Sequence, residues 1–160
     1  ARESEPYRLL AARKVKHAKT AYTRYADIRK LSFLGDFNDY PENKSVKEVL
    51  EAAAPSTLQD SLRPQKLYHL LAGKAKTRKH FGSYKYQGEW GLLDHIIVSG
   101  TLLQEHAPLY TEEAKADVFC LPFLLTRDKK YGGQQPFRTY YGMKYQGGYS
   151  DHLPVYAEFG

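Results

Sequence analysis

Cysteine is nearly absent from the sequence, since Cys120 is the only one among 160 residues. A single thiol excludes a disulfide within the chain and a zinc site built from several cysteines. Cys120 stands in the apolar run VFCLPFLL, and this context predicts a buried and chemically inert thiol rather than a nucleophile.

Long hydrophobic runs are also absent. No stretch approaches the roughly 18 apolar residues of a membrane-spanning helix, so we expect a soluble chain without a membrane span. The sequence shows no signal peptide, and it opens on ARESEPYRLL without an initiator methionine. A targeting segment could therefore have been removed, and the localisation stays open.

Acidic residues are in the minority. Lys and Arg number 24 against 18 Asp and Glu, which gives a formal net charge of +6. Such a balance suits a polyanionic or phosphate-bearing partner without requiring one. With 42% hydrophobic residues, a chain of this length can bury one core, so a single domain is expected.

The first third of the sequence predicts alternating helices and strands. From Ser4 to about Lys30, apolar side chains recur at three- and four-residue steps, as in a helix. The apolar burst LSFLG, Leu31 to Gly35, predicts a buried strand. A second helix is expected from Ser45, which would cap it, and Pro55 would end it. A helix followed at once by a buried strand indicates a layered α/β protein.

The rest of the chain has weaker patterns. A polar, irregular segment is expected from about Gln59 to Phe81, and it includes the basic run KAKTRKH, Lys74 to His80. This run is either a solvated loop or a contact for phosphate. Beyond it we expect strands at Gly82–Tyr86, Leu92–Ser99 and Val155–Phe159, a strand with a helical turn in Ala116–Leu125, and a long aromatic-rich loop at Gly132–Gly148.

The motif GDFND directly follows the first predicted strand. Side chains alternate in an extended chain, so Asp36 and Asn38 should point to one side and Phe37 into the packing. A carboxylate and a carboxamide would then stand together at a strand end, where active sites of sheet proteins are commonly built. The alternative is that GDFND is only an Asx turn that joins a strand to a helix.

The motif LLDHI places Asp94 inside an otherwise apolar strand. A buried carboxylate is costly unless it is paired, so Asp94 should have a partner. We expect the imidazole of His152, in the motif SDH before the last strand, because adjacent His95 should point to the opposite face. The other histidines have no acidic motif beside them and are expected at the surface or in packing: His17, His69, His80 and His106.

These motifs, in this order, resemble the endonuclease/exonuclease/phosphatase family, the superfamily of deoxyribonuclease I, exonuclease III and the inositol-phosphate phosphatases. GDFN followed by SDHLPV is the most specific part of the resemblance, which covers nearly the whole chain. The matching segments are Arg8–Ala12, Gly35–Pro41, Tyr84–Asp94, Pro136–Gly142 and Gly147–Val155.

The resemblance implies a phosphoesterase, with a nuclease among the options, that uses Mg²⁺ or Mn²⁺. Asp36 would orient or deprotonate the attacking water and, with Asp151, serve the metal. Asn38 would hold water or phosphate, His152 would contact the scissile phosphate, and Asp94 would orient His152.

Substrate recognition is less well marked. The basic run and the segment from Tyr131 to Tyr145 are the hints that the sequence offers. Trp90 and Arg138 could stack on a base or pair with phosphate, although Trp90 is equally well explained as a packing residue. The substrate is therefore expected to be a phosphate ester, either nucleic acid or a small phosphorylated molecule.

The chain departs from the family pattern in size. Family domains are four-layer α/β/β/α sandwiches of about twice this length, and their principal metal-binding Glu lies in the N-terminal half. Residues 1–160 therefore resemble the C-terminal half of one such domain, whose N-terminal half is absent from this chain and would be its partner. We expect this half alone to be inactive, with an uncovered apolar sheet face. The alternative is a non-catalytic protein that binds a phosphorylated ligand or nucleic acid.

Overall fold

The computed structural model describes residues 3–24, 30–57 and 62–160. Its longest helix, α1 (Glu5–Arg24), confirms the first predicted helix, whereas residues 25–29 of that prediction lie outside the described part. The other helical segments are short: a π-helical turn at Ser45–Val49, α2 at Ala72–Thr77, and 3₁₀ turns at Pro55–Thr57, Gly100–Leu103, Glu113–Lys115 and Pro122–Leu124.

A three-stranded antiparallel sheet forms the centre. Its order is β1 (Ser32–Asp36), β5 (Asp94–Ser99) and β2 (Leu67–His69). The other strands form pairs: β3 (Tyr84–Tyr86) with β4 (Glu89–Gly91), β6 (Ala116–Val118) with β11 (Val155–Ala157), β7 (Leu125–Arg127) with β8 (Gln134–Pro136), and β9 (Tyr140–Tyr141) with β10 (Lys144–Tyr145).

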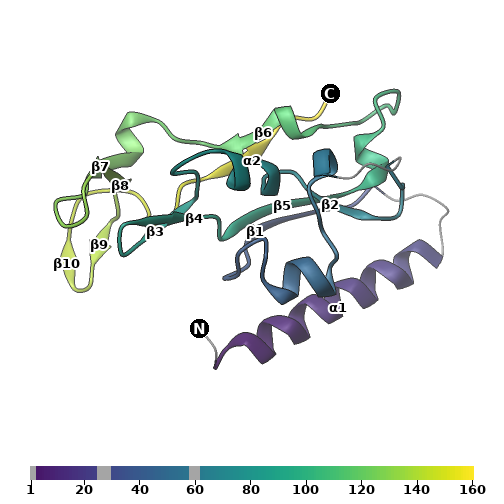
Figure 1. Cartoon of the computed structure of the whole chain (residues 1–160), viewed down its shortest axis with the longest axis horizontal. Coiled ribbons are helices and arrows are strands. Elements are labelled where there is room, and N and C mark those ends of the chain that lie inside the picture. The colour runs from purple at the N-terminus through teal and green to yellow at the C-terminus, as the bar shows by residue number, and fades with distance from the viewer. Residues whose placement is uncertain (1–2, 25–29, 58–61) are drawn as a thin grey trace.

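The alternation of side chains along β5 separates two hydrophobic clusters. Ile97 faces α1 and packs with Ala12, Val46 and Leu67. Ile96 and Val98 point to the other face, in a second cluster to which α2, β6 and β11 contribute: Leu70, Leu71, Leu92, Leu102 and Ala116, with Val118, Val155 and Ala157 packed against them. Figure 1 shows this arrangement, with α1 below the sheet and the β6–β11 pair above it. The fold is therefore mixed α/β, as predicted.

The first predicted strand is only half-buried. Ser32, Leu34 and Asp36 are exposed, whereas Phe33 packs toward α1. Leu34 is 56% exposed although it lies opposite fully buried Ile96. The prediction of an uncovered apolar face is therefore wrong at β5, which other elements cover, and at β1 only Leu34 of the three exposed side chains is apolar.

The second predicted helix is wrong in extent. Only the single turn Ser45–Val49 forms, and Ser45 does not cap it. The hydroxyl of Ser45 instead donates to Asp39 Oδ2 at 2.7 Å. Pro55 begins a 3₁₀ turn rather than ending a helix.

The predicted irregular segment before Phe81 contains regular structure. Strand β2 is fully buried, and α2 holds most of the basic run. Lys74 and Arg78 both form ion pairs with Asp117, so this part of the run stabilises the fold rather than standing in a free loop.

The predicted aromatic-rich loop is also more ordered than expected. Strands β7 to β10 form two hairpins at one end of the molecule, beyond β3 and β4 (Figure 1). The β9–β10 turn begins with Gly142 at a φ of 56°, a conformation that a two-residue hairpin turn needs at that position.

Candidate active site

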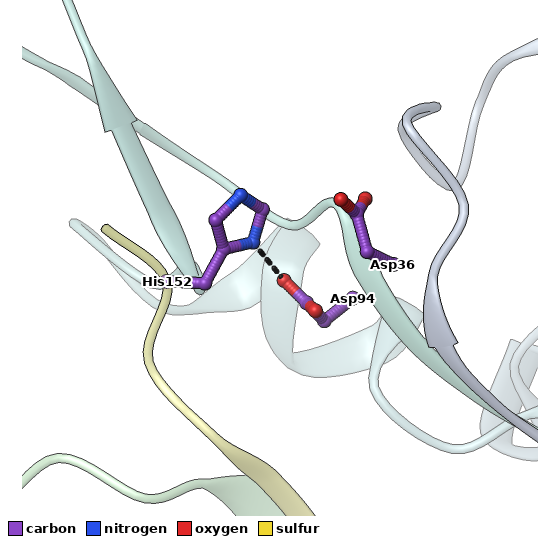
Figure 2. A group of neighbouring side chains, drawn as sticks. All are labelled: Asp36, Asp94 and His152. Carbon is purple, nitrogen blue, oxygen red and sulfur yellow. Dashed lines mark hydrogen bonds and ion pairs between the residues drawn. The ribbon is translucent and has the colours of Figure 1, made fainter. Parts of the chain in front are cut away.

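The site is centred on Asp94 and His152, which the structure brings together. Asp94 begins β5, and His152 lies in the turn before β11. The Nδ1 of His152 lies 2.6 Å from Asp94 Oδ2, and both side chains are largely buried. Nδ1–H of His152 donates to the carboxylate. In this tautomer Nε2 carries a free lone pair, which can accept a proton or a hydrogen bond. Figure 2 shows this pair beside Asp36.

The pair is supported from β3. The hydroxyl of Ser83 donates to the same Asp94 oxygen at 2.6 Å. The ring of Tyr84, the next residue, lies 4.9 Å from the His152 ring, centroid to centroid. The backbone N–H of His152 also donates to Ser150 Oγ at 3.0 Å. Asp94, the Tyr84 ring and Ser150 thus hold His152 in place. Tyr84 opens a segment that matches the family pattern, whereas no motif marks Ser83.

The GDFND motif follows β1 beside the pair. Asp36 and Asn38 are exposed, and the ring of Phe37 packs on that of His95 at 4.9 Å. The N–H of Asn38 donates to Asp36 Oδ1 at 2.8 Å, and Asn38 has a φ of 51°. The motif is therefore an Asx turn, and this turn leaves the Asp36 carboxylate at the site. The Asx-turn interpretation of GDFND is therefore confirmed, and the catalytic interpretation stays a prediction.

Two carboxylates face each other at the end of the sheet. Asp36 is directly opposite Asp94 in the β1–β5 register. Like charges in this position destabilise a strand pair unless a positive charge lies between them. Asp36, Asp94 and His152 each offer a ligand atom, and these atoms lie within 4.8 Å of one another. Carboxylate oxygens are the donors that Mg²⁺ and Mn²⁺ prefer, so this group fits a hard divalent cation.

The remaining predicted residues lie outside this group. Asp151 is exposed and is not a member of the cluster that could hold a metal. Trp90 is half-buried and lines a surface hollow of about 430 Å³ together with Tyr40 and Tyr86. Arg138 belongs to the hairpins, where its guanidinium lies 5.5 Å from the centre of the Tyr141 ring.

A buried histidine pair behind the GDFND turn was missed from the sequence. His69 Nδ1 accepts the N–H groups of Leu71 and Ala72, each at 3.1 Å, so its proton is on Nε2. This Nε2 bonds Nδ1 of His95, whose own Nε2–H donates to the Asp39 carbonyl at 2.5 Å. Burial lowers the pKa of His95, and burial together with the His95 ring holds the pKa of His69 well below its usual value. Both rings are therefore neutral near pH 7.

The second aspartate of GDFND links this turn to α1. Asp39 is buried, and its Oδ1 lies 2.8 Å from Nε of Arg8. Arg8 is the first residue of the matching segment Arg8–Ala12. The sequence therefore marked Arg8 as part of the family pattern but did not show that it pairs with Asp39. Together the ion pair and the histidine pair hold the turn from two sides.

Cys120 contradicts the prediction of a buried thiol, because its side chain is exposed. The apolar run around it crosses the surface after β6, and its neighbours Phe119 and Leu121 are exposed as well. Although the residue is exposed, partial desolvation of the thiol, and then the nearby Asp117 carboxylate, raise its pKa.

An α/β sheet that presents two carboxylates and an oriented imidazole at one end is typical of hydrolases that act on phosphate esters. The model of the endonuclease/exonuclease/phosphatase family matches residues 1–160, and the chain belongs to this family. Its members are generally phosphoester hydrolases or nucleases that use divalent metal ions. Searches of curated proteins and of solved structures found no match. No helix in the described part of the chain is long and apolar enough to cross a membrane.

Proposed function

We propose that this protein is a metal-dependent phosphoesterase that hydrolyses a phosphodiester or phosphomonoester. The observation that carries the proposal is the Asp94–His152 pair with the Asp36 carboxylate beside it at the end of β1 and β5. This arrangement combines an oriented imidazole with carboxylate oxygens that suit a hard cation. A bound Mg²⁺ or Mn²⁺ would polarise the phosphoryl oxygens and neutralise charge at phosphorus.

The residues divide the work as follows. Asp36 orients or deprotonates the attacking water and would contribute an oxygen to a bound metal ion. His152 contacts the scissile phosphate through Nε2, and Asp94 keeps Nδ1 protonated and the ring in place. Asn38 holds water or phosphate, and exposed Asp151 would add a metal ligand in the completed cleft. Trp90 and Arg138 contact the substrate away from the reacting atoms.

We further propose that a second sheet, the N-terminal half of a four-layer sandwich, completes the cleft. Leu34, an apolar side chain that is 56% exposed on the edge strand β1, is a residue that such a sheet would cover. That half would supply the principal metal-binding Glu. The present chain alone should therefore hydrolyse phosphate esters very slowly, if at all.

The test is hydrolysis of an aryl phosphodiester by the full-length protein, with Mg²⁺ or Mn²⁺ and with chelator. Asp36→Asn keeps the shape of the side chain and removes its charge, so it should lower the metal-dependent rate at least about 100-fold. Glu48→Gln is the matched control, because Glu48 is an exposed carboxylate on the π-helical turn and should leave the rate unchanged.

The outcomes separate the alternatives. Metal-dependent turnover that survives Asp36→Asn would overturn the assignment of the site. Turnover of an aryl phosphomonoester alone would restrict the enzyme to monoesters. No metal-dependent turnover of either compound would favour the non-catalytic protein that binds a phosphate ligand or nucleic acid.

A further inference from the structure

The two hairpins carry an unusual set of exposed side chains. We call residues 125–149, which contain β7 to β10, the tyrosine arm. Five of its residues are tyrosines, and each is between 48% and 68% exposed: Tyr131, Tyr140, Tyr141, Tyr145 and Tyr149. Met143 at the turn of the second hairpin is 98% exposed. Tyr140 packs edge-on against Tyr145, and Tyr149 packs against Phe123 and Phe137, yet all five rings keep about half or more of their surface exposed and available for contact with a ligand.

The charge of the arm is one-sided. It has five cationic side chains and a single carboxylate, Asp128. That carboxylate is buried and paired with Lys85 at 2.9 Å, so it does not offset the cations at the surface. The exposed part of the arm is therefore positive as well as aromatic: Arg127, Lys129, Lys130, Arg138 and Lys144 are its cations.

Arg138 lies beside the Tyr141 ring and has unused hydrogen-bonding capacity. Its guanidinium lies over the Tyr141 ring, and no group in the described part of the chain accepts a bond from its buried Nε. Lys130 similarly lies 5.0 Å from the centre of the Tyr131 ring. Cations held beside ring faces suit a ligand that alternates flat rings with negative charges.

The arm is held in a fixed position relative to the site. Asp128 Oδ1 accepts the N–H groups of Lys130 and Tyr131, and Lys85 also donates to the Gly132 carbonyl at 2.8 Å. Lys85 is the neighbour in β3 of Tyr84, whose ring lies against His152. A preorganised platform binds without a large cost in ordering, and this one is joined to the site through a single strand.

We propose that the tyrosine arm binds single-stranded nucleic acid, with bases stacked on its tyrosines and phosphates paired with its cations. This inference rests on the proposed function and names its substrate class. Base stacking on aromatic side chains tolerates any sequence, because every base has a flat face. A membrane-anchoring surface would instead show Leu, Phe and Trp. The exposed large hydrophobic side chains of residues 125–149 are tyrosines and one methionine, and exposed Phe119, Leu121 and Phe123 precede the arm in the chain, which is why the test below includes lipid vesicles.

The experiment measures fluorescence anisotropy of a labelled single strand of about 15 nucleotides, a length suited to such sites. The protein is titrated in EDTA, so that binding is observed without hydrolysis and is independent of the proposed activity. The double variant Tyr141→Ala and Tyr145→Ala should weaken binding by roughly tenfold or more, and Tyr→Phe at both positions should restore it. Tyr7→Ala is the matched control, since Tyr7 is 75% exposed on α1.

Three results would overturn the inference. The first is no binding at low salt, and the second is an equal loss from Tyr7→Ala and from the double arm variant. The third is binding to vesicles of anionic phospholipid that the arm variant abolishes, with no binding to the oligonucleotide. Specific loss in the arm variant, together with affinity that falls as salt rises, supports it. None of these results bears on metal-dependent hydrolysis, so the two proposals fail separately.

Discussion

Asp94 shows how much one side chain can organise. One of its oxygens accepts hydrogen bonds from both Ser83 and His152, and these two residues come from different segments of the chain. Each bond to a carboxylate is stronger than one between neutral groups. The carboxylate at the first position of β5 therefore orients His152, together with the Tyr84 ring and Ser150.

Cys120 allows a direct test of the local electrostatics. Its pKa is raised by burial and by Asp117, so thiolate is scarce near pH 7 and reaction with a disulfide reagent should be slow although the side chain is exposed. Asp117→Asn removes the negative charge near the thiol and should lower the pKa of Cys120. Labelling at pH 8 should then be several-fold faster.

The control for this test is Asp151→Asn, which changes an exposed carboxylate that does not act on the thiol. Labelling with Ellman's reagent gives the rate in each case. An unchanged rate in Asp117→Asn would contradict the expected influence of that carboxylate.

The histidine pair links β2 and β5 and makes stability depend on pH. The pKa of His69 in the fold lies well below its ordinary value of about 6.5, because burial and the His95 ring disfavour the charged form. Below pH 6.5 the unfolded chain takes up a proton that the folded chain does not. Stability is therefore full above this pH and falls as pH drops, by about 1.4 kcal/mol per pH unit for each such proton.

Urea unfolding at pH 7.5 and at pH 5.5 would measure this effect. The glutamine in His69→Gln cannot be protonated, so this variant should show a shallower fall, whatever its stability at pH 7.5. His106→Gln, at an exposed position, is the control, and its free energy of unfolding should change between the two pH values as much as that of the parent. If the free energy of unfolding fell by the same amount in the parent and in His69→Gln, the buried His69 ring would not be the source of the pH dependence.

Strands with strong patterns could be predicted from the sequence, and short ones could not. The apolar residues of LLDHIIVS predicted a strand at Leu92–Ser99, and β5 begins two residues later, at Asp94. A short apolar run rich in Val and Ile is typical of a buried strand. Strand β2 has three residues in a polar setting and forms because β5 offers it a partner. Local sequence cannot show such a partner. The two hairpins of the arm were predicted as one long loop, because their glycines indicate turns but do not show which residues pair between the turns.

The candidate site was predicted in part for the same reason. Asp36, Asp94 and His152 lie in motifs with chemical content, and the structure brings these three together. Ser83, Tyr84 and His69 act through contacts across 10 to 70 residues of sequence, and their types give no hint of a partner. Cys120 was misjudged because an apolar run usually indicates burial, whereas this run lies at the surface.

As a whole, the molecule is layered on both faces of the central sheet. Helix α1 covers one face, and α2, β6 and β11 cover the other face over β5, whereas Leu34 of the edge strand β1 lies exposed on that second face. Leu34→Lys should change the free energy of unfolding of this chain by less than about 0.5 kcal/mol, because an exposed side chain loses little. In the full-length protein, where the proposed second sheet covers Leu34, the same change should destabilise by several times more.

Thermal and urea unfolding of both proteins, each with and without Leu34→Lys, would check this expectation. Lys47→Leu, on the exposed side of the π-helical turn, serves as a surface control in both. Equal small effects of Leu34→Lys in the two proteins would argue against a covering sheet. A large effect in the chain alone would show that Leu34 already packs here.

Strand β5 places a functional and a structural residue next to each other on opposite faces. Asp94 points to the site, and His95 points to the buried pair. A slip of one residue in its pairing would exchange them, because strand side chains alternate with a period of two. Asp94 would then enter the apolar layer without a partner, at a cost that a marginally stable chain cannot bear. The slipped pairing would therefore be less stable than the native one, so the register that folding favours is also the register that assembles the site.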